Sequence, residues 1–418
     1  MEKHKSSEPN QVTSKKTDFR KLVARGNSLW MKLALIAMGC LISLVMTEAI
    51  LIGFRISFPL LYQADDVCGT RLKPGLNVRY IEEGQSIVKT NSIGFRDFEH
   101  TLNKPAGVFR IAVIGDSFCE GLQVDVTKTF WHLLGTRLQD QDNRLVEVLN
   151  FGTSGYGTAQ ELETLKKYAA GFKPDLTILA IFTGNDIGDN SSKINQGQIK
   201  PYYQYQDGEL VLDRRFRQDP EFVSNRSAFT RFKAGLINSS RSLQLANKFY
   251  SAWKNRRISG DRSDIGLDPN VYRSPGPGTE WEEAWRVTEG LLMLFQEECR
   301  RMNSGLLIVT LSNPIQVHPD RKRKSEFLEQ NTIDDLFYPD RRLLNFCESN
   351  NIVCLSLAET FSKAVDSASP SLYLHGFSNT EMGAGHWNED GHQLASETIY
   401  SFLTFGGGNG LLSGGKRD

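Results

Sequence analysis

Apolar and polar positions alternate along most of the chain after residue 108 in two distinct patterns. Short apolar runs bounded by turn residues predict buried strands near 110–114, 145–150, 175–182, 305–311 and 352–356. Longer stretches with apolar residues every three or four positions predict helices near 127–140, 158–171, 282–303, 339–350 and 389–404. Strands that alternate with helices predict an α/β fold, a three-layer α/β/α sandwich with a central parallel sheet.

A different pattern occupies the N-terminal end. Residues 33–54 are almost continuously apolar, which is long enough for a helix that spans a bilayer. Residues 31–54 are therefore predicted to be a transmembrane anchor. Residues 1–30 hold seven Lys/Arg against three acidic residues, so the positive-inside rule predicts a cytoplasmic basic tail and a single-pass membrane protein. Everything after Arg55 is then expected to be periplasmic or extracellular.

A cleaved signal peptide is the alternative for this segment. Its apolar run is longer than the core of a usual signal peptide, and no small-x-small cleavage site follows promptly, which favours the anchor. Glu48 is costly in lipid unless it lies near the far interface, six residues before Phe54.

Three further segments complete the domain organisation. Residues 55–108 form a lead-in with strand character, and residues 190–280 are a long insertion between the predicted strands. Asp207-Gly208 predicts a hairpin turn in this insertion, and 227–257 has helical spacing with basic residues, so we interpret it as a cap over the site; a solvated surface excursion is the alternative. Residues 405–418 are glycine-rich and predict a flexible tail.

Candidate chemistry gathers where the predicted strands end. Ser117 follows a buried strand through Gly-Asp-Ser, and open α/β sheets bind ligands at the carboxyl ends of their strands. A second strand ends in a glycine-rich loop, Phe151-Gly-Thr-Ser-Gly-Tyr-Gly157, and a third ends in Gly184-Asn-Asp186. Near the C-terminus, Gly385-His-Trp-Asn388 precedes the last predicted helix.

These four blocks, in this order, resemble the SGNH/GDSL hydrolase family over residues 109–404. The resemblance implies that Ser117 is the nucleophile and His386 the base. It also implies an oxyanion hole built from Ser117, Gly155 and Asn185. Serine needs a base to become nucleophilic, and hydrogen-bond donors around the developing oxyanion are usually the largest catalytic contribution.

The sequence departs from the family pattern at one position. The family has an aspartate three residues before the histidine, whereas this chain has Gly383. Three interpretations stay open: a Ser–His dyad oriented by a backbone carbonyl, a carboxylate from elsewhere with Glu381 as the nearest upstream candidate, or weak or lost activity. Asp116 and Asp186 are expected to brace the loops, and Asn185 taken alone also fits a turn that caps the following segment.

Composition excludes other classes of protein. Lys+Arg and Asp+Glu are equal at 49 each, so no basic excess indicates nucleic acid as a partner. No metal-binding or phosphate-cradling motif is present, so we expect no metal and no cofactor. The six cysteines do not indicate a disulfide framework in a chain of 418 residues; Cys347 and Cys354 are the one candidate pair, with burial as thiols favoured.

The sequence therefore predicts a membrane-anchored serine esterase acting through an acyl-serine. The lead-in, which ends in Asn-Ser-x-Gly-Phe-Arg, resembles that of membrane-anchored SGNH proteins in bacterial surface-polysaccharide systems. This resemblance implies an acylated carbohydrate or another small ester as substrate, and the polysaccharide-biosynthesis machinery as a partner. A carbohydrate O-acetyltransferase using the same serine and a catalytically silent binding or assembly subunit are the alternatives.

Overall fold

The computed structural model describes residues 15–142, 144–255 and 266–413. Residues 1–14, which belong to the predicted cytoplasmic tail, and residues 414–418 lie outside this range. The centre of the fold is a five-stranded sheet in the order β11-β10-β7-β5-β6, and all four strand pairs are parallel. Its strands are β5 (Phe109–Gly115), β6 (Val146–Asn150), β7 (Leu176–Phe182), β10 (Gly305–Leu311) and β11 (Val353–Ser356). Each lies within two residues of its predicted bounds, and β5, β7 and β10 are buried apolar runs along almost their whole length.

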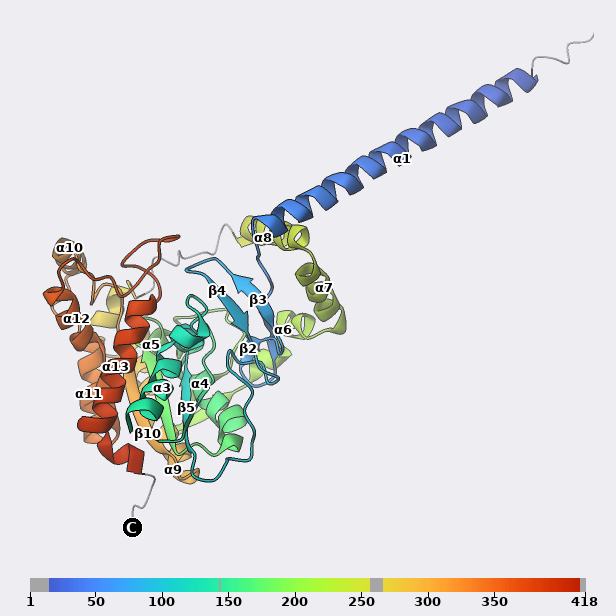
Figure 1. Cartoon of the computed structure of the whole chain (residues 1–418). Coiled ribbons are helices and arrows are strands. Elements are labelled where there is room, and N and C mark those ends of the chain that lie inside the picture. The colour runs from blue at the N-terminus through green and yellow to red at the C-terminus, as the bar shows by residue number, and fades with distance from the viewer. Residues whose placement is uncertain (1–14, 143, 256–265, 414–418) are drawn as a thin grey trace, which may run out of the picture.

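Helices cover both faces of the sheet (Figure 1). One face packs against α3 (Phe130–Asp142), α12 (Ala358–Ser367) and α13 (Glu389–Phe405). The other packs against α4 (Thr158–Thr164), α9 (Glu280–Arg301) and α11 (Tyr338–Ser349). The predicted α/β/α sandwich is confirmed.

The direction of the chain across the sheet reverses beside β5. The connection from β5 to β6 runs through α3 on one face, whereas the connections after β6 run through α4, α9 and α11 on the other. Ligand crevices form where neighbouring strands send their connections to opposite faces. The carboxyl ends of β5 and β7 meet at this point.

The lead-in folds into two small antiparallel pairs. β1 (Tyr62–Asp65) pairs with β2 (Gly69–Leu72), and β3 (Asn77–Tyr80) pairs with β4 (Ser86–Lys89). The short turn between β3 and β4 contains Glu83, whose side chain is buried.

The insertion contains the predicted hairpin and helices. β8 (Tyr202–Gln206) and β9 (Glu209–Asp213) pair across Asp207-Gly208, and both turn residues have positive φ, as a tight hairpin turn requires. Three helices follow: α6 (Pro220–Asn225), α7 (Ala228–Ser239) and α8 (Arg241–Asn255).

A single long helix, α1 (Lys15–Gly53), projects from the body (Figure 1). Within the described residues, Leu29–Gly53 is the one segment long and apolar enough to cross a membrane, and 6% of its most apolar window is buried. The prediction of an apolar spanning segment at 31–54 agrees with this finding.

The C-terminal residues and the cysteines were both the subject of predictions. The predicted flexible tail is wrong for residues 406–413, because a short 3-10 helix (Asn409–Ser413) buries Leu411 and Leu412 against the core. Residues 414–418 are outside the described range. All six cysteines are free thiols, including Cys347 and Cys354.

Five of the described helices were not predicted. Two are single turns that follow strands, α2 (Ser117–Glu120) and α5 (Asp186–Asp189). The others are α6, α12 and α10 (Arg321–Asn331), whose sequence is mostly polar and which buries none of its residues.

Candidate active site

Ser117 lies at the first position of α2, immediately after β5. Every residue of β5 is buried, and Asp116 caps the short helix by accepting a hydrogen bond from Phe118 N at 3.0 Å. This sharp turn from strand to helix leaves the Ser117 hydroxyl at the carboxyl edge of the sheet. The expectation that Asp116 braces the loop agrees with this contact.

His386 contacts the serine directly. Its Nε2 lies 2.8 Å from Ser117 Oγ, although 269 residues separate the two in sequence. Its ring packs against Phe118 on the same side of the sheet, with 5.0 Å between ring centres. A histidine nitrogen at this distance can accept the hydroxyl proton as the serine oxygen attacks.

The carboxylate that contacts His386 is Glu83, not Glu381. Glu83 Oε2 lies 2.6 Å from His386 Nδ1, and Glu83 Oε1 accepts a hydrogen bond from the His386 backbone N at 2.8 Å. Because a carboxylate only accepts, the first contact requires a proton on Nδ1 and leaves Nε2 free to accept from serine. Ser117, His386 and Glu83 thus form a continuous hydrogen-bonded chain.

Glu381 was the nearest acidic side chain upstream, but the structure places it elsewhere. Its carboxylate is half exposed and pairs with Arg323 Nη1 at 2.7 Å. A backbone carbonyl is not needed as the orienting group either, since Glu83 occupies the position beside Nδ1.

Two glycines explain the departure from the family pattern. Gly383 has φ of +85°, and a side chain there would place its Cβ 2.5 Å from His318 Nε2. Gly385 has φ of +72°, and a Cβ there would lie 2.2 Å from Glu83 Oε1. The backbone before His386 therefore requires glycine at 383 and leaves room at 385 for the carboxylate of Glu83.

The turn that carries Glu83 is fixed by the loop before His386. Asn379 accepts a hydrogen bond from Gly84 N at 2.9 Å and donates to Ile81 O and Gly84 O, both at 3.1 Å. The sequence offered no sign of this arrangement, because Glu82-Glu83-Gly84 is an ordinary polar turn until a loop 295 residues away is placed against it.

His375 holds the other side of the His386 loop. Its Nδ1 lies 2.8 Å from Gly385 O, and its Nε2 lies 3.1 Å from Ser312 Oγ, an oxygen that accepts a hydrogen bond from Trp387 Nε1 at 2.9 Å. Burial lowers the pKa of His375 to about 3, so the ring is neutral and donates from Nδ1.

The predicted oxyanion residues surround the same point. Ser117, Gly155, Asn185 and His386 all line one cavity of about 1230 Å³. Gly155 has φ of +75°, and nothing lies within 4 Å of where its Cβ would be, so the backbone is open to the cavity. Asn185 occupies the N-cap position before α5, but its side chain makes no capping hydrogen bond, so the alternative of a purely capping residue does not describe it.

Glu120 holds the Gly155 loop in place. Its carboxylate accepts hydrogen bonds from Ser154 Oγ and, at 2.7 Å, from Tyr62 OH. Burial raises the pKa of Glu120 to about 7. This contact joins α2, the loop after β6 and the lead-in, and the sequence did not indicate it.

Buried acids lie behind the serine. Burial raises the pKa of Asp116 to about 6, and it raises the pKa values of Asp186 and Glu161 well above their usual range. Asp186 accepts a hydrogen bond from Phe182 N at 2.8 Å, which agrees with its expected bracing role.

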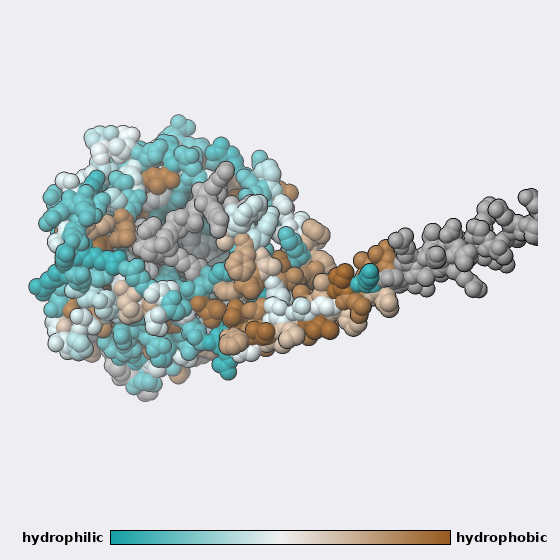
Figure 2. Space-filling view, turned by 90° about the horizontal axis from the view of Figure 1, so that it is seen from above, coloured by the Kyte–Doolittle hydropathy of each residue, from teal (hydrophilic) through white to brown (hydrophobic). Residues whose placement is uncertain are grey.

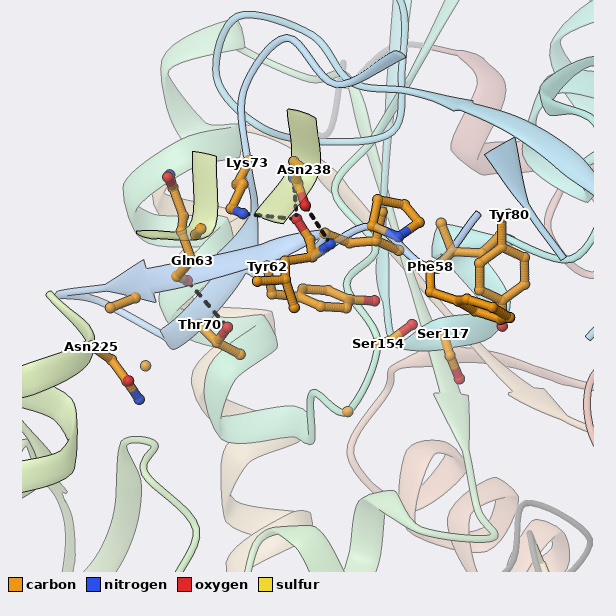
Figure 3. Close-up of a pocket in the computed structure, with 18 of the residues that line it drawn as sticks. Phe58, Tyr62, Gln63, Thr70, Lys73, Tyr80, Ser117, Ser154, Asn225 and Asn238 are labelled. Atoms are coloured by element: carbon orange, nitrogen blue, oxygen red, sulfur yellow. Dashed lines mark hydrogen bonds between the residues drawn. The ribbon is translucent and has the colours of Figure 1, made fainter. Parts of the chain in front are cut away.

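The lead-in and the insertion form the cavity walls. Phe58, Tyr62 and Tyr80 line it from the lead-in, and Asn225 and Asn238 line it from the insertion (Figure 3). Ser117 and Ser154 lie in the same cavity (Figure 3). The predicted boundary at 109 therefore does not separate the site from the lead-in, which supplies both a wall and the carboxylate of Glu83. Among the described residues, no group of three or more potential ligands is arranged to hold a metal ion.

The fold and these contacts define an α/β protein with a serine–histidine–glutamate site at the switch point of its sheet. The four sequence blocks lie after β5, β6 and β7 and before α13, the arrangement that the resemblance to SGNH/GDSL hydrolases implies.

Comparisons with known proteins give distant structural likenesses. No protein-family model and no curated protein matches the chain. A member of the lipolytic protein G-D-S-L family from Veillonella parvula is 12% identical, with a TM-score of 0.36 over 71% of this chain and 98% of that one. An acetyl xylan esterase from Geobacillus stearothermophilus is 11% identical, with a TM-score of 0.37 over 71% and 95%. The chemistry is therefore inferred from the geometry of this chain.

Proposed function

We propose that this chain is a serine esterase of the SGNH type that cleaves an ester through an acyl-serine. The observation that carries the proposal is the hydrogen-bonded chain Glu83–His386–Ser117, with contacts of 2.6 and 2.8 Å. Three groups with these roles convert a weak hydroxyl into a nucleophile.

In the proposed reaction, Ser117 Oγ attacks the ester carbonyl as its proton passes to His386 Nε2. The backbone N–H groups of Ser117 and Gly155 and the side-chain amide of Asn185 stabilise the oxyanion. Protonated His386 then donates to the departing alcohol. Water, activated by the same nitrogen, releases the acid and restores the serine.

The substrate that we propose is an O-acyl group, such as acetyl, on a cell-surface or exported carbohydrate. This part rests on the resemblance of the lead-in to those of surface-polysaccharide proteins. The cavity supports it in one respect: at about 1230 Å³ it exceeds the range of about 300–1,000 Å³ typical of small-molecule pockets. Such a volume also suits an acyl acceptor, so carbohydrate O-acetyl transfer is the second candidate.

The test is turnover of a soluble aryl acetate by the full-length chain, with and without sugar acceptors. Ser117→Ala is expected to abolish turnover, whereas Ser367→Ala, which removes an exposed hydroxyl on α12 away from the cavity, should leave turnover unchanged. Acetylated sugar among the products would identify a transferase. Equal activity in the wild type and Ser117→Ala would overturn the serine assignment.

We further propose that α1 is an uncleaved anchor with its N-terminus in the cytoplasm and the Ser117 domain outside it. The apolar helix and the basic residues that precede it support this topology. A reporter active only in the cytoplasm, fused after residue 418, should give no signal in intact cells. A strong signal would reverse the orientation.

A further inference from the structure

The insertion carries a strongly basic segment with exposed apolar side chains. Residues 226–255 contain six Lys/Arg and no Asp or Glu. In α7, Phe229 and Phe232 are 75% and 65% exposed, and in α8, Phe249 and Trp253 are 68% and 69% exposed. Basic amphipathic helices with exposed aromatic residues are typical of segments that lie in a membrane interface.

The two sides of α7 face different surroundings. Thr230, Ala234 and Asn238, spaced four residues apart, line the active-site cavity. Phe229, Phe232 and Leu236 fall on the opposite side of the helix and are exposed. A single helix thus separates the cavity from an apolar outer surface.

Glu48 holds the N-terminus of α8 against α1 and so determines where α8 begins along the anchor. Its carboxylate accepts hydrogen bonds from the backbone N of Arg241 and Ser242 at 2.6 and 2.9 Å, at the N-terminus of α8. It also accepts from the Ser240 and Ser242 hydroxyls at 2.8 and 2.7 Å. A carboxylate at a helix N-terminus is stabilised by the helix dipole. Because Glu48 lies about 9 Å along the helix axis before Phe54, α8 begins beside the end of the apolar span.

Other contacts hold both helices to the lead-in. Gln244 Oε1 accepts from Phe58 N at 2.9 Å, and Asn238 accepts from Leu60 N at 2.8 Å. Lys248 pairs with Glu82 at 2.9 Å and lies 3.8 Å from the ring centre of Phe58. The anchor, α7, α8 and the cavity wall are therefore joined by direct contacts, and α8 lies at the base of α1 (Figure 1).

From this arrangement we propose that α7 and α8 rest in the headgroup region of the bilayer that α1 spans, on the side where α1 ends. The occupant of the apolar surface is the lipid itself, with anionic headgroups against the basic residues. Figure 2 shows apolar residues gathered where α1 joins the body, continuous with the apolar helix. The inference rests on the anchor proposed above.

The proposed position of α7 and α8 favours one class of substrate, an ester whose carrier is held in the membrane. With α7 between the bilayer and the cavity, the site is positioned for an ester on a carrier that is itself held in the membrane. In this arrangement the lipid carrier of an acylated molecule stays in the bilayer, while the ester that it carries enters the cavity beside α7. A freely diffusing ester gains nothing from the exposed aromatic side chains.

The first experiment measures depth in the full chain, reconstituted in vesicles of neutral and anionic phospholipid. Nitroxide labels are attached to Phe232→Cys or Phe249→Cys in a Cys40→Ser background. Lys322→Cys on α10 is the aqueous control, and Leu41→Cys in α1 is the lipid control. Labels at 232 and 249 should be more accessible to oxygen than to a water-soluble nickel chelate, with the opposite order at 322.

Each other outcome contradicts the inference in its own way. Labels at 232 and 249 that are more accessible to the nickel chelate than to oxygen, with the opposite order at 41, would overturn the interfacial position of α7 and α8. The proposal that α1 spans the bilayer would still hold. Labels shielded from both reagents would identify a protein contact, such as a second copy, in place of lipid. A label at 41 that is more accessible to the nickel chelate than to oxygen would overturn both the membrane-spanning role of α1 and the interfacial position of α7 and α8.

The second experiment compares two acetate esters in the same vesicles. The triple variant Phe229→Ser/Phe232→Ser/Phe249→Ser should lower turnover of a phospholipid-linked aryl acetate by about tenfold or more, a loss of about 1.4 kcal/mol. Its turnover of a soluble aryl acetate should be unchanged. Leu145→Ser, which removes an exposed leucine at the opposite end of the sheet, is the matched control. Equal loss on both esters would overturn the substrate class. Inactivity of the wild type on both esters would contradict the esterase and leave the label measurement valid.

Discussion

At the scale of single residues, Glu83 is the acidic side chain that contacts His386, where the resemblance to SGNH/GDSL hydrolases implied an aspartate three residues before the histidine. It lies in the turn between β3 and β4, and its two oxygens bind the side chain and the backbone of the same residue, His386. This double contact fixes both the tautomer and the orientation of the ring. Gly385 is the complementary feature, because any side chain there would meet Glu83.

Glu83→Gln is expected to lower kcat on aryl acetate by roughly 10⁴-fold, because the amide no longer enforces the productive tautomer. Glu381→Gln is the matched control and should leave kcat near that of the wild type, since Glu381 pairs with Arg323 at the surface. Steady-state kinetics on both folded variants checks this. A severe loss in Glu381→Gln with a mild one in Glu83→Gln would refute the assignment.

Restoring the family pattern with Gly383→Asp should harm the protein. The new side chain would be strained at φ of +85° and would meet His318. We expect the free energy of unfolding to fall by roughly 1–3 kcal/mol and turnover to fall with it. Gly107→Asp, at φ of +76° in open space, isolates the backbone cost. Denaturant unfolding of both variants makes the comparison; a Gly383→Asp variant as stable as the wild type and more active would show that His386 lacks an orienting acid.

At the scale of elements, the sheet could be predicted and the source of the acid could not. Buried apolar runs determine β5, β7 and β10 locally, and Asp207-Gly208 determines its own hairpin. Ser117, Gly155 and Asn185 each follow a strand that the sequence predicts. Their meeting at one edge of the sheet was therefore predictable as well. Glu83 contacts a residue 303 positions away, and only the packed fold brings the two together. The polar helix α10 was missed because it buries no apolar face.

The β3–β4 turn also yields a prediction. Asn379→Ala removes the hydrogen bonds that hold the turn against the His386 loop. We expect kcat to fall about tenfold, with a smaller change in KM for aryl acetate, because the acid is displaced from His386 while Ser117, Gly155 and Asn185 keep their places. Asn331→Ala, which removes one local hydrogen bond on α10, is the control. A change in KM alone, with kcat preserved, would show that the turn acts on binding instead.

At the scale of the whole molecule, the core couples stability to pH. His392 is buried against Phe130, and burial lowers its pKa to about 3. Between about pH 6.5 and 3 the unfolded chain takes up a proton at this position and the folded chain does not, so the folded state loses stability as the pH falls. Glu120 and Asp340 have pKa values raised to about 7 and about 6 by burial and act in the opposite direction.

His392→Gln isolates the histidine contribution, since the carboxyl groups are common to both proteins. The difference in unfolding free energy between the wild type and the variant should shrink as the pH falls from 7 to 4. Denaturant unfolding at several pH values measures it. Profiles that stay parallel over this range would contradict a neutral buried His392.

The most direct test of the central claim is covalent capture of the nucleophile in the full-length wild-type chain. A fluorophosphonate reacts with a serine hydroxyl that a neighbouring base activates, and it leaves a stable phosphonyl ester on that oxygen. Peptide mass spectrometry should find the adduct on Ser117 alone, with its rate of formation strongly reduced in Glu83→Gln and unchanged in Glu381→Gln. An unmodified Ser117, or labelling that Glu83→Gln leaves as fast as in the wild type, would contradict the Glu83–His386–Ser117 site.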